Sequence, residues 1–156
     1  MQVLKAECRQ ATLDDVETLF QLIKGYAEKG IMLPRTRESL HQIIDTFVVA
    51  QVGDEVVGCG SLCQLGKDLV EIRSLGMTED YKGLGIGTLL VDALSEQARE
   101  LGVTKVMALT YAVPFFQKNG FTVVEKEIFP EKVWKDCVNC PKQHACDEIA
   151  VLKTLH

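Results

Sequence analysis

Alternating apolar and polar positions along the chain predict seven β-strands. Successive side chains in a strand point to opposite faces, so a period of two indicates a half-buried strand. The pattern occurs at residues 3–9, 47–52, 56–65, 69–77, 103–109, 121–126 and 148–155. Gly53-Asp54-Glu55 separates the second segment from the third and is typical of a hairpin turn. The second, third and fourth segments are therefore expected to form one sheet.

Helical spacing of apolar residues predicts four helices between these strands, at residues 11–25, 36–45, 84–101 and 113–119. Thr12 and Thr36 are candidate N-caps, while Gly25, Gly102 and Gly120 mark helix ends. The order is a strand, two helices, three strands, a helix, a strand, a helix and two further strands. We expect an α/β fold in one domain over residues 1–156, with a mixed, mostly antiparallel sheet and helices on both faces.

Composition places the chain among ordinary globular proteins, with 156 residues, 47% hydrophobic and 25% charged. A chain of this size normally buries one sizeable core. It has no apolar run long enough for a membrane span, and its first residues lack the order of a secretion signal. We expect a cytoplasmic protein with no membrane partner. The net charge of −5, without a basic cluster, argues against nucleic acid as a partner.

The six cysteines raise a redox and a metal question. Cys8, Cys59 and Cys63 lie in strand-like stretches and are expected to be reduced thiols. The segment 127–147 adds ligand types that suit tetrahedral zinc, namely Cys137, Cys140, His144 and Cys146. The first two have the Cys-x-x-Cys spacing, but the second spacing is tight for a zinc knuckle. Zinc, a reduced loop, and a disulfide or redox role remain open.

The strongest chemical signal is a glycine-rich turn at the start of the 84–101 helix. Gly83, Gly85 and Gly87 remove side chains where exposed N–H groups and the helix dipole converge, which indicates an anion site. A dinucleotide-binding loop would need Gly-x-Gly-x-x-Gly, and a nucleotide-triphosphate loop would end in Gly-Lys-Ser/Thr. Neither pattern is present. A purely structural turn is the alternative on this motif alone.

At these residues the sequence resembles the GNAT family of N-acetyltransferases. The stretch Lys82-Gly-Leu-Gly-Ile-Gly87 is similar to the family's pyrophosphate loop, with Lys82 in place of the usual Arg or Gln. Val113-Pro-Phe-Phe-Gln-Lys-Asn-Gly-Phe121 is similar to its second signature. Within the family the chain looks most like N-acetylglutamate synthases and related amino-acid acetyltransferases, through residues 28–40, Val57-Gly-Cys59 and Leu109-Thr110.

The resemblance implies acetyl-CoA as cofactor and a small amine as acceptor. Backbone N–H groups near Leu75 would face the acyl oxygen, the backbone of Met77 would pair with the pantetheine arm, and the loop amides would hold the pyrophosphate. The implied cofactor-binding residues are Leu75, Gly76, Met77, Lys82, Gly83, Leu84, Gly85, Ile86, Gly87, Thr88 and Phe116. Members of the family often pair through a sheet edge or the C-terminal segment, so a homodimer is expected.

Acetyl transfer requires a base that deprotonates the amine. Glu71 is our candidate, acting directly or through a water, and its alternative is a solvated residue paired with Arg73. Many family members carry a Tyr acid at the position of Phe116, which has no proton to donate. Tyr111 and Ser74 are substitutes, and water is a third. For Tyr111 a packed rim aromatic is the alternative.

An amino-acid acceptor needs a cation for its carboxylate, and the planar guanidinium suits that task. Arg35 and Arg37 in the expected substrate-side loop, and Arg73 on the strand, are candidates, although each is equally consistent with a solvated surface residue. The negative net charge fits a cationic peptide or polyamine better than an anionic amino acid. Protein or polyamine acetylation and a non-catalytic acyl-CoA sensor therefore stand as alternatives.

Overall fold

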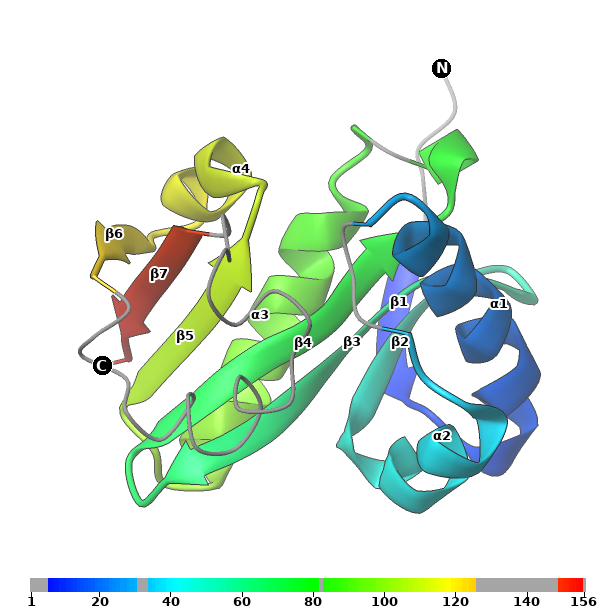
Figure 1. Ribbon diagram of the computed structural model, residues 1–156, viewed down its shortest axis with the longest axis horizontal. Coiled ribbons are helices and arrows are strands. Elements are labelled where there is room, and N and C mark those ends of the chain that lie inside the picture. Colours follow the sequence, from blue (N-terminus) through cyan, green and yellow to red (C-terminus); the bar gives the residue numbers. More distant parts are fainter. Residues whose placement is uncertain (1–5, 31–33, 82, 126–148, 156) are drawn as a thin grey trace. The chain divides into compact units, whose positions relative to one another are not determined.

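The computed structural model describes residues 6–30, 34–81, 83–125 and 149–155. Their strands are hydrogen-bonded in the order β1-β2-β3-β4-β5-β7-β6 (Figure 1). The strands are β1 (Ala6–Gln10), β2 (Phe47–Val52), β3 (Glu55–Gly66), β4 (Leu69–Met77), β5 (Lys105–Thr110), β6 (Thr122–Val124) and β7 (Ile149–Thr154). The only parallel register among the described pairings joins β4 and β5, so the predicted mixed, mostly antiparallel sheet is confirmed.

The helices occur where the sequence predicted them, with different bounds at their ends. They are α1 (Val16–Glu28), α2 (Arg37–Ile43), α3 (Ile86–Glu100) and α4 (Val113–Lys118), with short 3-10 turns at Leu13–Asp15, Ile44–Thr46 and Glu79–Tyr81. Gly25 was expected to end the first helix, which instead continues to Glu28. A single glycine costs a helix about 1 kcal/mol, and tertiary contacts made by the following turn outweigh it. Thr36 caps α2 as predicted, because its hydroxyl accepts a hydrogen bond from the Ser39 N–H.

The chain forms two compact units. The first comprises the described residues up to Leu62 together with Ile72–Gln97, and the second comprises Cys63–Glu71 and the described residues from Ala98 onward.

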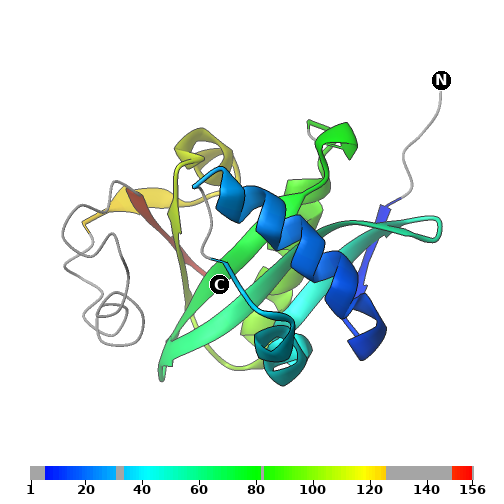
Figure 2. The same ribbon diagram turned by 45° about the vertical axis from the view of Figure 1, so that its right-hand side comes forward.

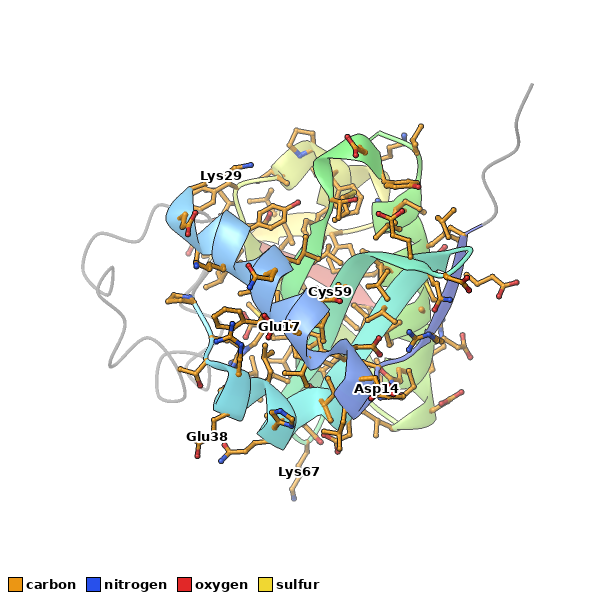
Figure 3. The ribbon with its side chains drawn as sticks, turned by 90° about the vertical axis from the view of Figure 1, so that its right-hand side faces the viewer. Asp14, Glu17, Lys29, Glu38, Cys59 and Lys67 are labelled. Carbon is orange, nitrogen blue, oxygen red and sulfur yellow. The ribbon has the colours of Figure 1, made fainter. Side chains whose placement is uncertain are left out.

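In the first unit, helices lie on both faces of the sheet (Figure 2). The helices α1 and α2 cover one face through a core of Leu19, Ile23, Leu40, Phe47, Val49 and Cys59 with their neighbours. In the side-on view of Figure 3, Cys59 lies behind α1, which carries the exposed Glu17. The opposite face approaches α3 closely. A Cβ placed on Gly58 would lie 3.0 Å from Leu90 Cδ1, and one on Gly60 would lie 2.8 Å from Leu94 Cδ1.

In the second unit, β7 lies between β5 and β6 and pairs with both antiparallel. Met107 and Ala150 form its small core with flanking leucines and Val124. The α4 residue Phe116 packs edge-to-face against Phe121, which follows the helix, and against its neighbour Phe115, each at 5.1 Å between ring centroids. The turn before β4 is tied to β5 by Asp68, whose carboxylate accepts hydrogen bonds from the N–H and the hydroxyl of Thr104.

Candidate functional site

The strand β4 departs from regular geometry within its second half. Ser74 has a φ of 54°, which is the left-handed region that residues other than glycine rarely adopt. The described pairing of β4 with β5 covers Leu69 to Glu71. The irregularity therefore falls one residue before Leu75, where the resemblance implied free backbone N–H groups. Strained backbone of this kind is often retained at functional sites.

The next stretch of β4 packs against α1. The Tyr26 hydroxyl accepts a hydrogen bond from the Met77 N–H at 3.1 Å and lies 3.0 Å from the Met77 carbonyl, to which it donates. Gly76 makes room for the tyrosine ring, since a Cβ there would lie 2.7 Å from Tyr26 Cε2. Tyr26 therefore contacts both predicted cofactor residues, Gly76 through its ring and Met77 through its hydroxyl.

The glycine turn leads into α3 as the anion-site hypothesis requires. Gly83 and Gly85 adopt positive φ values of 78° and 86°, and no atom lies within 4 Å of a Cβ built on either. The exposed backbone is therefore open to a ligand. The helix begins at Ile86, and the first N–H groups of an α-helix lack partners within the helix. These features fit a pyrophosphate. Ile86 and Gly87 are buried and Thr88 is half-buried, while Lys82 lies outside the described residues.

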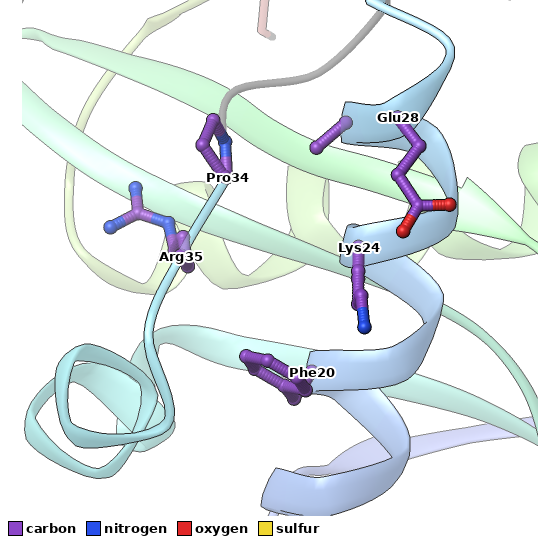
Figure 4. A pocket seen from close by; sticks show the side chains of 6 residues that line it. Phe20, Lys24, Glu28, Pro34 and Arg35 are labelled. Atoms are coloured by element: carbon purple, nitrogen blue, oxygen red, sulfur yellow. The ribbon is translucent and has the colours of Figure 1, made fainter.

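A pocket of about 350 Å³ lies in the first unit between α1 and the segment that precedes α2 (Figure 4). Its lining comprises Phe20, Lys24, Ala27, Glu28, Pro34 and Arg35. Arg35, predicted as the carboxylate ligand, is half-buried, and its guanidinium lies 3.5 Å from the Ser39 hydroxyl. The lining is mostly apolar, and its ionisable residues are Lys24, Arg35 and Glu28.

The second predicted arginine, Arg37, is engaged with α1. Its guanidinium donates to the two carboxylate oxygens of Glu17 at 2.7 and 3.0 Å and stacks over the Phe20 ring, 4.0 Å from the centroid. The hydrogen bond from Arg37 lowers the pKa of Glu17 to about 2. Because Phe20 lines the pocket, Arg37 supports the pocket wall. Arg73 is half-buried in β4.

Glu71 is buried, with 2% of its surface exposed. It is the last residue of the described β4–β5 pairing, opposite Met107. The alternative of a solvated surface carboxylate is therefore wrong. A carboxylate is costly to remove from water, so burial needs compensating partners or a chemical role. Tyr111, the candidate acid, is 39% exposed, whereas Phe116 is buried in its aromatic cluster.

The metal hypothesis concerns Cys137, Cys140, His144 and Cys146, which lie outside the described residues. Within the described part of the chain, no cluster of three or more His, Cys, Asp or Glu residues could hold a metal ion. Cys8, Cys59 and Cys63 are free, as predicted. Burial raises the pKa of the Cys59 thiol to about 12, so this thiol is protonated and unreactive at neutral pH.

Among the described helices, none is long and apolar enough to cross a membrane.

Several pocket and strand contacts were not predicted from sequence, namely Phe20, Lys24, Tyr26 and Glu28. A signal for Tyr26 was present, because Leu19, Ile23 and Tyr26 continue one helical stripe past Gly25. Because Gly25 is typical of a helix end, the sequence alone does not extend this stripe to Tyr26. No local pattern marks Lys24 and Glu28, since their role depends on which face of α1 meets the segment before α2.

Comparison with known proteins agrees with this geometry. The model of the Acetyltransferase (GNAT) family matches residues 13–121. The chain therefore belongs to the GNAT acetyltransferase family and is an N-acetyltransferase. The family and the fold that the resemblance implied are thereby confirmed.

Three similar proteins align with most of this chain. An uncharacterized N-acetyltransferase of Chlorobaculum tepidum is 44% identical over 147 residues, which cover 94% of this chain and 95% of that protein. An amino-acid acetyltransferase of Mycobacterium tuberculosis is 38% identical over 131 residues, covering 79% of this chain and 75% of the relative. The structure of N-acetylglutamate synthase from Neisseria gonorrhoeae, complexed with coenzyme A and N-acetyl-glutamate, aligns with a TM-score of 0.89 at 25% identity. That alignment covers 99% of this chain but only 36% of the synthase.

Proposed function

We propose that the protein transfers the acetyl group of acetyl-CoA to the α-amino group of an amino acid, with a glutamate-like acceptor favoured. The observation that carries this proposal is the charge content of the pocket. Lys24 and Arg35 supply two positive charges and Glu28 one negative charge. A dicarboxylic amino acid presents the complement, two carboxylates and one ammonium group. A polyamine would place several cations against Lys24 and Arg35, which opposes the polyamine alternative.

The cofactor proposal is supported by the backbone around α3 and β4. The open amides from Gly83 to Thr88 suit the pyrophosphate, and the Met77 backbone suits an amide of the pantetheine arm. The gonococcal synthase that shares this fold is complexed with coenzyme A and N-acetyl-glutamate, which supports both ligands for this chain. Phe116 and Lys82 remain predicted contacts, and the homodimer and the zinc ion remain predictions from sequence.

The acetyl transfer needs three functions from the chain, namely a general base, donors for the carbonyl oxygen and a proton source for the thiolate. The thioester supplies the electrophilic carbonyl. Glu71 would accept the proton that leaves the ammonium group, directly or through a water, so that the amine can attack. Backbone N–H groups near Leu75 would donate to the carbonyl oxygen as negative charge develops there. A carbon–nitrogen bond forms and the carbon–sulfur bond breaks. The nitrogen loses its second proton to water, and the departing thiolate takes a proton from Tyr111 or from water.

Thiol release from acetyl-CoA tests this proposal. The purified protein would be assayed against L-glutamate, L-glutamine, L-aspartate, D-glutamate, spermidine and a basic peptide. We expect turnover with L-glutamate or a close analogue, and the acetylated product would be identified by mass spectrometry. Turnover confined to spermidine or the peptide would overturn the amino-acid proposal. Tight coenzyme A binding without turnover of any acceptor would favour the sensor alternative.

A further inference from the structure

The Tyr26 hydroxyl satisfies both backbone groups of one strand residue that lies 51 positions away in the sequence. It accepts from the Met77 N–H and donates to the Met77 carbonyl, at 3.1 and 3.0 Å. An added strand, or the secondary amide of a ligand, would hydrogen-bond to these same two groups, the N–H and the carbonyl of the strand residue. One phenol oxygen thus takes the place of an added strand.

The direction of these groups follows from the next residue. The Thr78 N–H donates to the Val57 carbonyl of β3 at 2.9 Å. Backbone groups of successive strand residues point to opposite sides, so the N–H and carbonyl of Met77 point away from β3. They present a strand edge to which an extended ligand could add, as peptides add to exposed sheet edges.

We propose that the Tyr26 hydroxyl is an internal competitor for the Met77 backbone, which must release that residue before an amide of the pantetheine arm can pair there. This inference rests on the proposed function, because it takes acetyl-CoA as the ligand. Two donor–acceptor contacts cannot be shared fully between a phenol and an amide. The affinity for the cofactor is therefore lowered by what the Tyr26 contacts contribute.

Displacement of the Tyr26 hydroxyl from Met77 would also affect the proposed amino-acid pocket. The next two residues of α1 are Ala27 and Glu28, and both line the pocket. The end of α1 is closed by the Lys29 N–H donating to the Tyr26 carbonyl and by the Gly30 N–H donating to the Ala27 carbonyl, at 3.1 and 2.9 Å. Gly25, directly before Tyr26, weakens the helix at this point. The final turn is therefore the part of α1 that we expect to move when the Tyr26 hydroxyl releases Met77, and Glu28 would move with it.

Titration calorimetry with the full chain tests the competition. Coenzyme A would be titrated into the wild-type protein and into Tyr26→Phe, which keeps the ring against Gly76 and removes the hydroxyl. We expect the Kd for coenzyme A to fall about three- to tenfold in the variant, as for the loss of one or two hydrogen-bonded competitors. The adenosine 3′-phosphate 5′-diphosphate fragment lacks the pantetheine arm, so its Kd should be the same for both proteins.

The outcomes separate the two proposals. If the wild-type protein fails to bind coenzyme A, the proposed function is wrong. If both proteins bind it but Tyr26→Phe binds equally or more weakly, the competitor inference is overturned and Tyr26 is a ligand or a packing residue. An equal gain for the fragment also overturns it, because the effect would then come from outside the pantetheine path.

Hydrogen exchange provides a readout that is independent of turnover. In the wild-type protein, coenzyme A should speed exchange at the Lys29 and Gly30 amides and slow it at Met77. In Tyr26→Phe the Lys29 and Gly30 amides should exchange quickly before ligand is added. Unchanged exchange at Lys29 and Gly30 on binding would contradict the movement of the last turn.

Discussion

Gly76 in β4 lies directly beneath the ring of Tyr26, with 2.7 Å between the ring carbon Cε2 and the place a Cβ would occupy. Gly76→Ala should therefore overpack this contact and lower the free energy of unfolding by about 1–3 kcal/mol. Chemical denaturation followed by circular dichroism would measure the change.

Gly25→Ala is the matched control for that substitution. Gly25 lies inside α1, and no atom is within 4 Å of a Cβ built there. Alanine favours helix over glycine, so this variant should be more stable by about 0.5–1 kcal/mol. Equal effects at Gly25 and Gly76 would show that the Tyr26 contact is not what constrains Gly76.

Glu71→Gln should abolish most of the turnover, because the amide keeps the shape of the buried side chain but accepts no proton. We expect kcat to fall about 10²- to 10⁴-fold, the usual contribution of a general base. Coenzyme A affinity should change little. Steady-state thiol release gives kcat, and calorimetry gives the affinity. A loss of less than tenfold would rule out Glu71 as the base.

Arg35→Ala should weaken the acceptor, because a charged hydrogen bond to the carboxylate is lost. A contact of this kind contributes about 1.5–3 kcal/mol, so KM for the amino acid should rise roughly 10- to 150-fold with a smaller change in kcat. Arg37→Ala is the control from the same segment. Arg37 is paired with Glu17, so its loss should change KM far less. The reverse ranking would assign the carboxylate to Arg37.

Acid should destabilise the start of α1 through Asp15. This carboxylate accepts two hydrogen bonds from Arg9, at 2.8 and 3.0 Å, and one from the Thr12 N–H at 2.8 Å. The hydrogen bond from Arg9 holds the pKa of Asp15 below its usual value. A depressed folded-state pKa stabilises the fold above the unfolded-state value of about 3.9, and this stability is lost as the pH falls through the folded value.

Thermal melts of the wild-type protein and Asp15→Asn between pH 7 and pH 2 would reveal this contribution. The variant should be less stable at neutral pH, because the amide that replaces the carboxylate carries no charge for the Arg9 guanidinium and keeps only one acceptor oxygen. The two proteins should converge as the pH falls through the lowered folded-state pKa of Asp15. A constant difference across the whole range would mean that packing, and not ionisation, stabilises this contact.

The sequence predicted most of the fold because its signals are local. The strands Phe47–Val52 and Leu69–Met77 have the predicted bounds, and Thr36 caps α2 as its position indicated. The ends of helices were less well predicted where tertiary contacts determine the last residue of the helix. The helix α1 passes through Gly25 because the following turn is anchored by Tyr26 on β4.

The candidate site was only partly predictable. The glycine turn was visible as a motif, because backbone amides at a helix start act over a few consecutive residues. The pocket was less visible, since Lys24 and Glu28 on α1 meet Arg35 only after the chain has turned back. The sequence favours Arg35 over Arg37 only by its place in the expected substrate-side loop. In the structure Arg35 lines the pocket, whereas Arg37 is paired with Glu17, twenty positions away.

The two glycines of β3 that face α3 influence the position of the anion site, although they lie outside it. Gly58 and Gly60 let the helix rest almost on the backbone of the sheet, and the open turn at Gly83 and Gly85 leads into that same helix. A methyl group added at Gly58 would press on Ile86 and Leu90 in the first turns of α3, and one added at Gly60 would press on Leu94 farther along the helix. Mutational surveys should therefore record Gly58 and Gly60 as cofactor-affinity positions, although neither belongs to the glycine turn.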